Sequence, residues 1–197
     1  MRRTDLIAAY RNRLSLSKND ENDAKVLSMM GRDCFKEVTA EYVELMKLID
    51  EYYKQLNLLK LVKQFKASAE VVNLFRKNKR RVACQIISMA TNTISIYGPL
   101  CETLCLSDDS LYGKVALADL LLHVDFTAKL RSILCYVGLY KPNNGRYGHQ
   151  MNQAIHSLAI SYYRKHRVKA KEVRQLVRKI RNYVRAGGRP DSGEKAG

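Results

Sequence analysis

Apolar side chains recur along almost the whole chain at spacings of three and four residues, and convincing two-residue alternation is absent. The clearest row lies between residues 35 and 61 and consists of Val38, Tyr42, Leu45, Ile49, Tyr52 and Leu56. This spacing puts apolar side chains on one face of an α-helix, which must then pack against other helices. The pattern therefore predicts an all-α protein, a two-lobed multi-helix bundle of about nine to ten helices.

The expected helices follow from where this periodicity starts and stops. They cover residues 3–16, 26–30, 35–61 (one helix, or two with a break near Asn57), 69–77, 82–96, 111–123, a segment that ends near 140, 147–163 and 165–185. The sequence SKNDEND after residue 16 is typical of a turn and helix cap, and KPNNG at residues 141–145 is typical of a loop.

The boundary between the lobes is expected near YGP and LSDDS. Pro99 disfavours helical geometry at Gly98, and LSDDS supplies capping side chains for the helix that follows. This places an N-terminal helical lobe at residues 1–98 and a C-terminal helical lobe at residues 106–186. Residues 187–197 are small and polar and are expected to form a disordered tail.

Charge is the global property that says most about partners. The 197 residues include 35 Lys and Arg against 19 Asp and Glu, which gives a formal net charge of +16. Such an excess favours nucleic acid or anionic lipid as a partner, although a merely soluble basic protein is the alternative. The apolar run VALADLLLHV is interrupted by Asp119 and His123 and is shorter than the about 20 residues that span a bilayer, so membrane contact would be peripheral.

The densest group of positive side chains begins at residue 76. It consists of Arg76, Lys77, Lys79, Arg80 and Arg81, and it is preceded at helical spacing by Lys60, Lys63 and Lys66. Glu70 is the only acid between Lys54 and Arg81. So long a stretch with one acid favours a polyanion-binding site, which could also serve as a nuclear localisation signal. The alternative is a solvated turn between two helices.

A second basic group lies in the last expected helix and just before it. Its apolar face consists of Val173, Val177, Ile180 and Val184, and its basic residues are Arg164, Lys165, Arg167, Arg174, Arg178, Arg181 and Arg185. A basic amphipathic helix suits RNA, anionic lipid or an acidic partner. The alternative is an ordinary packed helix with an exposed basic face.

The strength of these attractions favours a coat over a lone adaptor. Each Lys or Arg near an anionic leaflet contributes about 1 kcal/mol. Five such residues hold a monomer with a Kd on the order of millimolar or slightly lower. Many copies side by side would multiply this affinity.

The side chains that catalysis or metal binding requires do not form a recognisable set. The five cysteines are an odd number without the spacing of a secreted disulfide framework, which favours reduced thiols in the cytosol or nucleus. Cys101 and Cys105 lie one helical turn apart, but no CxxC or HxxxH pair accompanies them. The sequence therefore predicts a protein that is not an enzyme and that uses no cofactor or metal.

Three segments resemble the matrix proteins of orthomyxoviruses, the influenza family, and the length is closest to that of fish isavirus matrix proteins. The segments are RKNKRRVACQIISMA, GKVALADLLLHVDFTAKLRSILCYVGLYKPNNG and a helix that ends in SYYRKHR. The resemblance covers about residues 70–170, and its most similar parts are CYVGLY and the arginine-rich start of the helix at Arg80. Of the family's basic surface, it carries over to Arg76, Lys77, Lys79, Arg80 and Arg81. The family's second basic run and its Cys/His cluster have no counterpart here.

The resemblance implies a two-lobed helical protein that polymerises beneath a viral envelope. Such a protein would bind anionic membrane lipids on one side and viral ribonucleoprotein or RNA on the other. It would be found in the virion, at the inner face of the envelope, and in the cytoplasm and nucleus of the host cell. The competing hypotheses are a dedicated RNA-binding protein without a membrane role, and a helical adaptor whose basic face meets an acidic protein.

Overall fold

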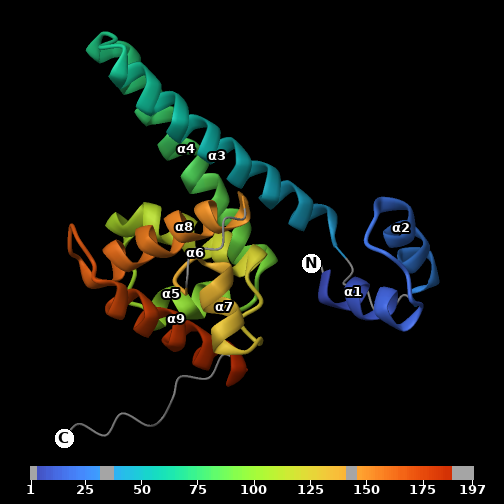
Figure 1. The fold of residues 1–197 in the computed structure, drawn as a ribbon. Coiled ribbons are helices and arrows are strands. Elements are labelled where there is room, and N and C mark those ends of the chain that lie inside the picture. Colours follow the sequence, from blue (N-terminus) through green and yellow to red (C-terminus); the bar gives the residue numbers. More distant parts are fainter. Residues whose placement is uncertain (1–3, 32–37, 141–145, 188–197) are drawn as a thin grey trace, which may run out of the picture. The chain divides into compact units, whose positions relative to one another are not determined.

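The computed structural model describes residues 4–31, 38–140 and 146–187. All regular secondary structure in these ranges is helical, which confirms the predicted all-α class (Figure 1). The chain divides into two compact units, Met1–Thr39 and Ala40–Gly197. The expected KPNNG loop, residues 188–197 of the expected tail, and Cys34 lie outside the described residues.

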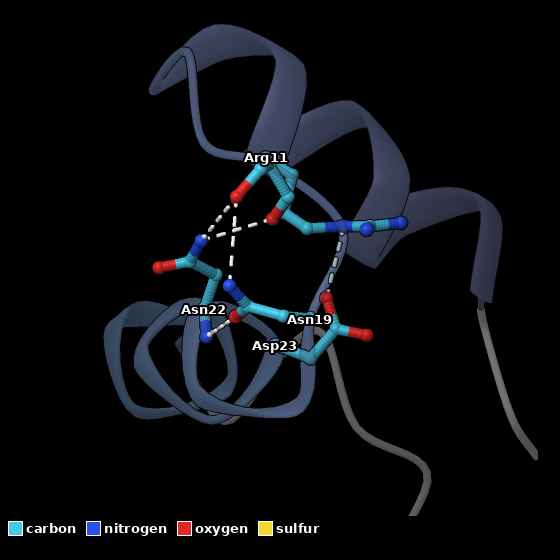
Figure 2. Close-up of polar contacts among 5 residues, drawn as sticks. Arg11, Asn19, Asn22 and Asp23 are labelled. Carbon is cyan, nitrogen blue, oxygen red and sulfur yellow. Dashed lines mark hydrogen bonds and ion pairs between the residues drawn. The ribbon is translucent and has the colours of Figure 1, made fainter.

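The first unit contains two short helices. They are α1 (Thr4–Arg13) and α2 (Asp20–Met29). α2 begins inside the SKNDEND segment because Asn19 caps it, accepting a 2.7 Å hydrogen bond from the Asn22 backbone N–H. The guanidinium Nε of Arg11 in α1 lies 2.9 Å from the Asp23 carboxylate of α2 (Figure 2). The turn and this ion pair hold the two helices together.

The second unit contains the remaining described helices. They are α3 (Ala40–Gln64), α4 (Ala69–Thr93), α5 (Tyr97–Thr103), α6 (Leu111–His123), α7 (Leu130–Tyr136), α8 (Arg146–Tyr163) and α9 (Ala170–Arg185), with a short 3-10 helix, η2 (Asp108–Ser110), before α6. α6 is central and packs against α3, α4, α5 and α8. All residues from Val115 to Leu120 are buried, as expected for a helix that is apolar on every side. None of the described helices is both long and apolar enough to cross a membrane.

The core of the second unit is continuous from Leu45 in α3 to Tyr183 in α9. Tyr97 and Leu100, on either side of Pro99, are buried in it. YGP begins α5, because Pro99 lies in the first turn, where its missing N–H would have no helical partner. The observed division between Thr39 and Ala40 therefore differs from the predicted boundary at residues 98–106.

α3 and α4 form a long antiparallel hairpin whose far end projects from the other helices of this unit (Figure 1). α3 has no break near Asn57. α4 is also continuous, so the prediction of separate helices at residues 69–77 and 82–96 is wrong. Lys and Arg are good helix formers, and no glycine or proline interrupts the segment. The basic cluster is therefore not a turn but part of a helix.

Candidate anion-binding surface

The tip of the hairpin is a four-residue connection, residues 65–68. The backbone N–H of Lys66 donates to the Lys63 carbonyl at 3.1 Å, and Lys66 adopts a left-handed φ of 51° that ends α3. The Ser68 Oγ then caps α4 by accepting a 3.4 Å hydrogen bond from the Val71 N–H. The chain reversal thus leaves Lys66 exposed at the far end of the hairpin.

Lys79 does not belong to the exposed group that the sequence predicts. Its residue exposure is 8%, and its ammonium lies 3.9 Å from the centre of the Tyr112 ring. A cation held against an aromatic face in this way contributes to packing and is shielded from an external anion. Because α4 is a continuous helix, one of the five clustered cations has to face inward.

Four other cations gather on one side of the hairpin, which we call the basic side. Its members are Lys60, Lys63, Arg76 and Arg80, all exposed. Each follows by one position a less exposed residue on the inward row of its helix; these residues are Leu59, Val62, Phe75 and Lys79. In two antiparallel helices, positions displaced in the same sense from the contact row share one side of the pair. Lys77 and Arg81 are also exposed but lie elsewhere on α4.

The C-terminal helix α9 has the predicted amphipathic character. Its buried side chains are Val173, Leu176, Val177, Ile180 and Tyr183, whereas Val184 is half-buried. Arg178 and Arg185 are exposed on the opposite face. The predicted apolar face is therefore confirmed, and Tyr183 and Leu176 extend it.

Two arginines of α9 hold the helix against its neighbours. Arg174 donates a 3.1 Å hydrogen bond to the carbonyl of Leu139, and Arg181 donates a 3.0 Å hydrogen bond to the carbonyl of Ala128. These bonds satisfy backbone acceptors near both ends of α7. Arg174 and Arg181 thus have a structural role that the sequence did not reveal.

The candidate cations that precede α9 differ in their contacts. Lys165 donates a 2.7 Å hydrogen bond to Glu172, and this bond, with one from the Lys169 backbone N–H, lowers the pKa of the Glu172 carboxyl. Arg164 and Arg167 are exposed. Among the described ion pairs, that of Lys165 is the only one that involves any of the fifteen candidate cations.

The structure does not bring the two basic groups together. Within the second unit, the tip of the α3–α4 hairpin and α9 lie at opposite ends (Figure 1). A flat anionic surface that meets the projecting end of the hairpin therefore leaves α9 available to a different partner.

A buried polar cluster joins α3, α6 and α8. Asp119 is fully buried; its carboxylate accepts a 2.7 Å hydrogen bond from the Tyr53 hydroxyl and lies 2.9 Å from His123 Nδ1. Gln150 Nε2 is 3.5 Å away. The hydrogen bond to Asp119 raises the pKa of His123, although burial opposes this change. In the sequence, Asp119 and His123 are only interruptions of an apolar run.

The described thiols differ in burial. Cys101 is buried, and burial raises the pKa of its thiol, which reduces its reactivity. Cys84 and Cys105 are exposed and free. Across the described ranges, no three His, Cys, Asp or Glu side chains are placed to hold a metal ion.

The sequence reasoning missed a set of exposed apolar side chains on the hairpin. They are Leu58, Leu61, Phe65, Val71 and Leu74. Their spacing of three and four residues forms a second stripe, separate from the one that faces the core. A search for two apolar stripes on one helix would have found it.

Comparison with known proteins adds no identification. No protein family, curated protein or solved structure matches this chain. The features that bear on function are therefore its own: an all-α fold, a projecting hairpin with a basic side, and a basic C-terminal helix.

Proposed function

We propose that this chain is a viral matrix protein, a non-enzymatic structural protein that self-associates under an envelope. In this proposal the hairpin cations bind anionic membrane lipid, and the basic residues in and before α9 contact viral ribonucleoprotein. The observation that supports it most is that the cations gather on particular faces and that only Lys165 of the fifteen candidates forms an ion pair in the described structure. The assignment to a virus rests on the sequence resemblance alone.

The size of the basic side fits a protein that acts in many copies. Its four cations contribute about 4 kcal/mol to adsorption on an anionic leaflet. This corresponds to a Kd on the order of 1 mM for one molecule. Side-by-side assembly would raise the affinity of the layer by orders of magnitude.

Flotation with vesicles tests the lipid claim. The quadruple reversal of Arg76, Lys77, Arg80 and Arg81 to Glu should reduce binding to anionic vesicles at least tenfold, because attraction becomes repulsion. Added salt should also weaken binding of the unmodified protein. A matched control reverses four exposed cations outside both groups, Arg13, Lys18, Lys47 and Lys129. Equal binding to neutral vesicles in high salt would contradict the proposal.

Self-association is tested on the same material. Electron microscopy of the vesicle-bound fraction should show ordered arrays of protein at the membrane. If saturating protein gives only isolated molecules without lateral order, the proposal of a matrix protein is contradicted. Peripheral lipid binding alone would then remain.

The second candidate function is RNA binding without a membrane role, and it is favoured by the exposed cations of α9. If six phosphates are neutralised, log affinity for single-stranded RNA should fall with log salt with a slope of about −4. Nanomolar binding of RNA by a monomer, together with no affinity for anionic vesicles, would favour this function over the first.

A further inference from the structure

The hairpin exposes more apolar surface than its packing requires. Phe65 at the tip is 82% exposed, Leu74 is 57% exposed and Leu61 is 46% exposed. Leu58 and Val71 are also exposed. Isolated exposed apolar residues are ordinary, but five near the distal end of one hairpin form a patch that marks an interaction site.

These side chains share one side of the hairpin, which we call the apolar side. Leu58 and Leu61 form one row on α3 that continues to Phe65 just after the end of this helix, and Val71 and Leu74 form one row on α4. Leu58, Leu61, Val71 and Leu74 each precede by one position a residue that faces the partner helix: Leu59, Val62, Val72 or Phe75. The displacement has the same sense on both antiparallel helices, so the two rows lie on the same side. The displacement on the basic side has the opposite sense, so the apolar side and the basic side lie on opposite sides of the hairpin.

Cations border the apolar side. On α3, Lys54 continues the row four residues before Leu58, and on α4, Arg81 continues the row seven residues after Leu74. Lys66 adjoins Phe65 at the tip and is exposed. Apolar side chains therefore occupy the distal end, and positive side chains lie behind them and beside them, together with one exposed acid, Glu70, which lies four residues before Leu74.

The charges around the apolar side indicate which partner can bind to it. A second hairpin placed symmetrically against this side would add Lys54, Lys66 and Arg81 of the other copy to the same three cations, with Glu70 as the one exposed acid near each tip to offset them. An anionic bilayer offers an apolar interior for the leucines and Phe65 and negative headgroups for the cations. Aromatic and aliphatic residues flanked by Lys and Arg are typical of helices that lie in the membrane interface.

We propose that the α3–α4 hairpin inserts the apolar side of its tip, led by Phe65, into the acyl region of an anionic bilayer. This inference rests on the lipid binding proposed above. At the tip it turns the apolar side toward the bilayer, so the cations that meet the headgroups there are those beside the apolar side and not those of the basic side. Lys54, Lys66 and Arg81 then lie at the depth of the headgroups. The long stems of these side chains allow the charges to stay in the polar layer.

The chain contains no tryptophan, so a single introduced indole reports on one position. In Phe65→Trp bound to anionic vesicles, the fluorescence should shift to the blue and should be quenched by lipids brominated on the acyl chain. The matched control is Ile160→Trp on α8, which is 42% exposed in the same unit and should show neither effect. Equal spectra for Trp at position 65 with and without bound vesicles would overturn the inference.

Affinity gives an independent measurement. Phe65→Ser combined with Leu74→Ser should weaken binding to anionic vesicles at least tenfold, because burial of two large apolar side chains is lost. Both positions are exposed, so circular dichroism and thermal unfolding should match the unmodified protein. Unchanged affinity of this folded variant would overturn the inference.

The outcomes separate the two proposals. If the unmodified chain does not bind anionic vesicles, both proposals fail. If it binds in a salt-sensitive way but Trp at position 65 is not quenched, adsorption through the basic side stands and insertion fails. A blue shift that grows with protein concentration without lipid would identify a second copy of the chain as the occupant and would overturn insertion.

Discussion

At the scale of the residue, several helix ends depend on non-glycine residues in a left-handed conformation. Within the described ranges these residues are Ser15, Lys66, Cys105 and Arg164, with φ between 48° and 52°. A side chain at such a position costs roughly 1–2 kcal/mol relative to ordinary geometry. Lys66 and Arg164 are also candidate anion-binding residues, so charge is placed at positions that glycine would occupy at lower cost.

Replacement of Cys105 by glycine should therefore stabilise the protein. Relief of the left-handed strain outweighs the greater freedom of glycine in the unfolded chain, and we expect a gain of roughly 0.5–1 kcal/mol in the free energy of unfolding. Urea denaturation of both proteins measures this. Lys66→Gly should give a similar gain but weaker binding to anionic vesicles. A loss of stability in Cys105→Gly would show that the thiol makes a stabilising contact.

Stability should depend on pH through His123. Its pKa is raised in the folded protein by the bond to Asp119, so folding favours the protonated form. This contribution is fully present below the unfolded pKa of about 6.5 and is lost as pH rises through the higher folded value. The difference in unfolding free energy between the unmodified protein and His123→Gln should therefore fall as pH rises above the unfolded value of about 6.5. A difference that is constant over this range would contradict the assignment.

At the scale of the element, the packing of α6 against α8 depends on one small residue. A Cβ atom placed on Gly113 would overlap Ser161 of α8, at its Cβ and at its Oγ, 2.5 Å away. The Ser161 Cβ is fixed to the backbone and cannot turn aside. The close approach of these two helices around the central helix therefore requires glycine at this position.

Gly113→Ala should destabilise the protein by about 1–3 kcal/mol, because α6 and α8 must move apart in a packed core. The control is Gly98→Ala in α5, where an added Cβ would meet no atom within 4 Å. Thermal unfolding followed by circular dichroism compares the two variants. Equal melting temperatures would mean that the α6–α8 contact adjusts without cost.

At the scale of the whole molecule, the two units have separate interiors. Val26 and Met30 are buried in the first unit, and the continuous core of the second unit draws all its members from residues 45–183. All fifteen candidate cations belong to the second unit. The second unit therefore has the core and the charged surfaces that the proposed function requires.

A chain that consists of residues 40–197 should fold cooperatively and should keep the vesicle affinity of the full chain within about threefold. Removal of residues 1–39 takes away no member of the buried core of the second unit. Circular dichroism, thermal unfolding and flotation test this expectation. A molten or aggregated product, or a tenfold loss of affinity, would show that the first unit supports the second.

Local periodicity was enough to predict the class of fold and most of the helices. The 3.6-residue pattern and the loss of that pattern at LSDDS are local properties, and α6 begins and ends where they indicate. The apolar face of α9 was also readable, because Val173, Val177 and Ile180 repeat with the helical period. Net charge required only counting.

Tertiary contacts decided the rest. That Lys79 faces Tyr112 while Arg80 is exposed depends on the position of α3 and α6 around α4, which no local pattern contains. The Asp119 carboxylate accepts a hydrogen bond from Tyr53, 66 positions away. The boundary between units depends on which helices share a core. The sequence by itself thus determined the helices and the sign of their charge, and only the packing of distant helices decided which side chains remain exposed, because burial results from contacts between segments.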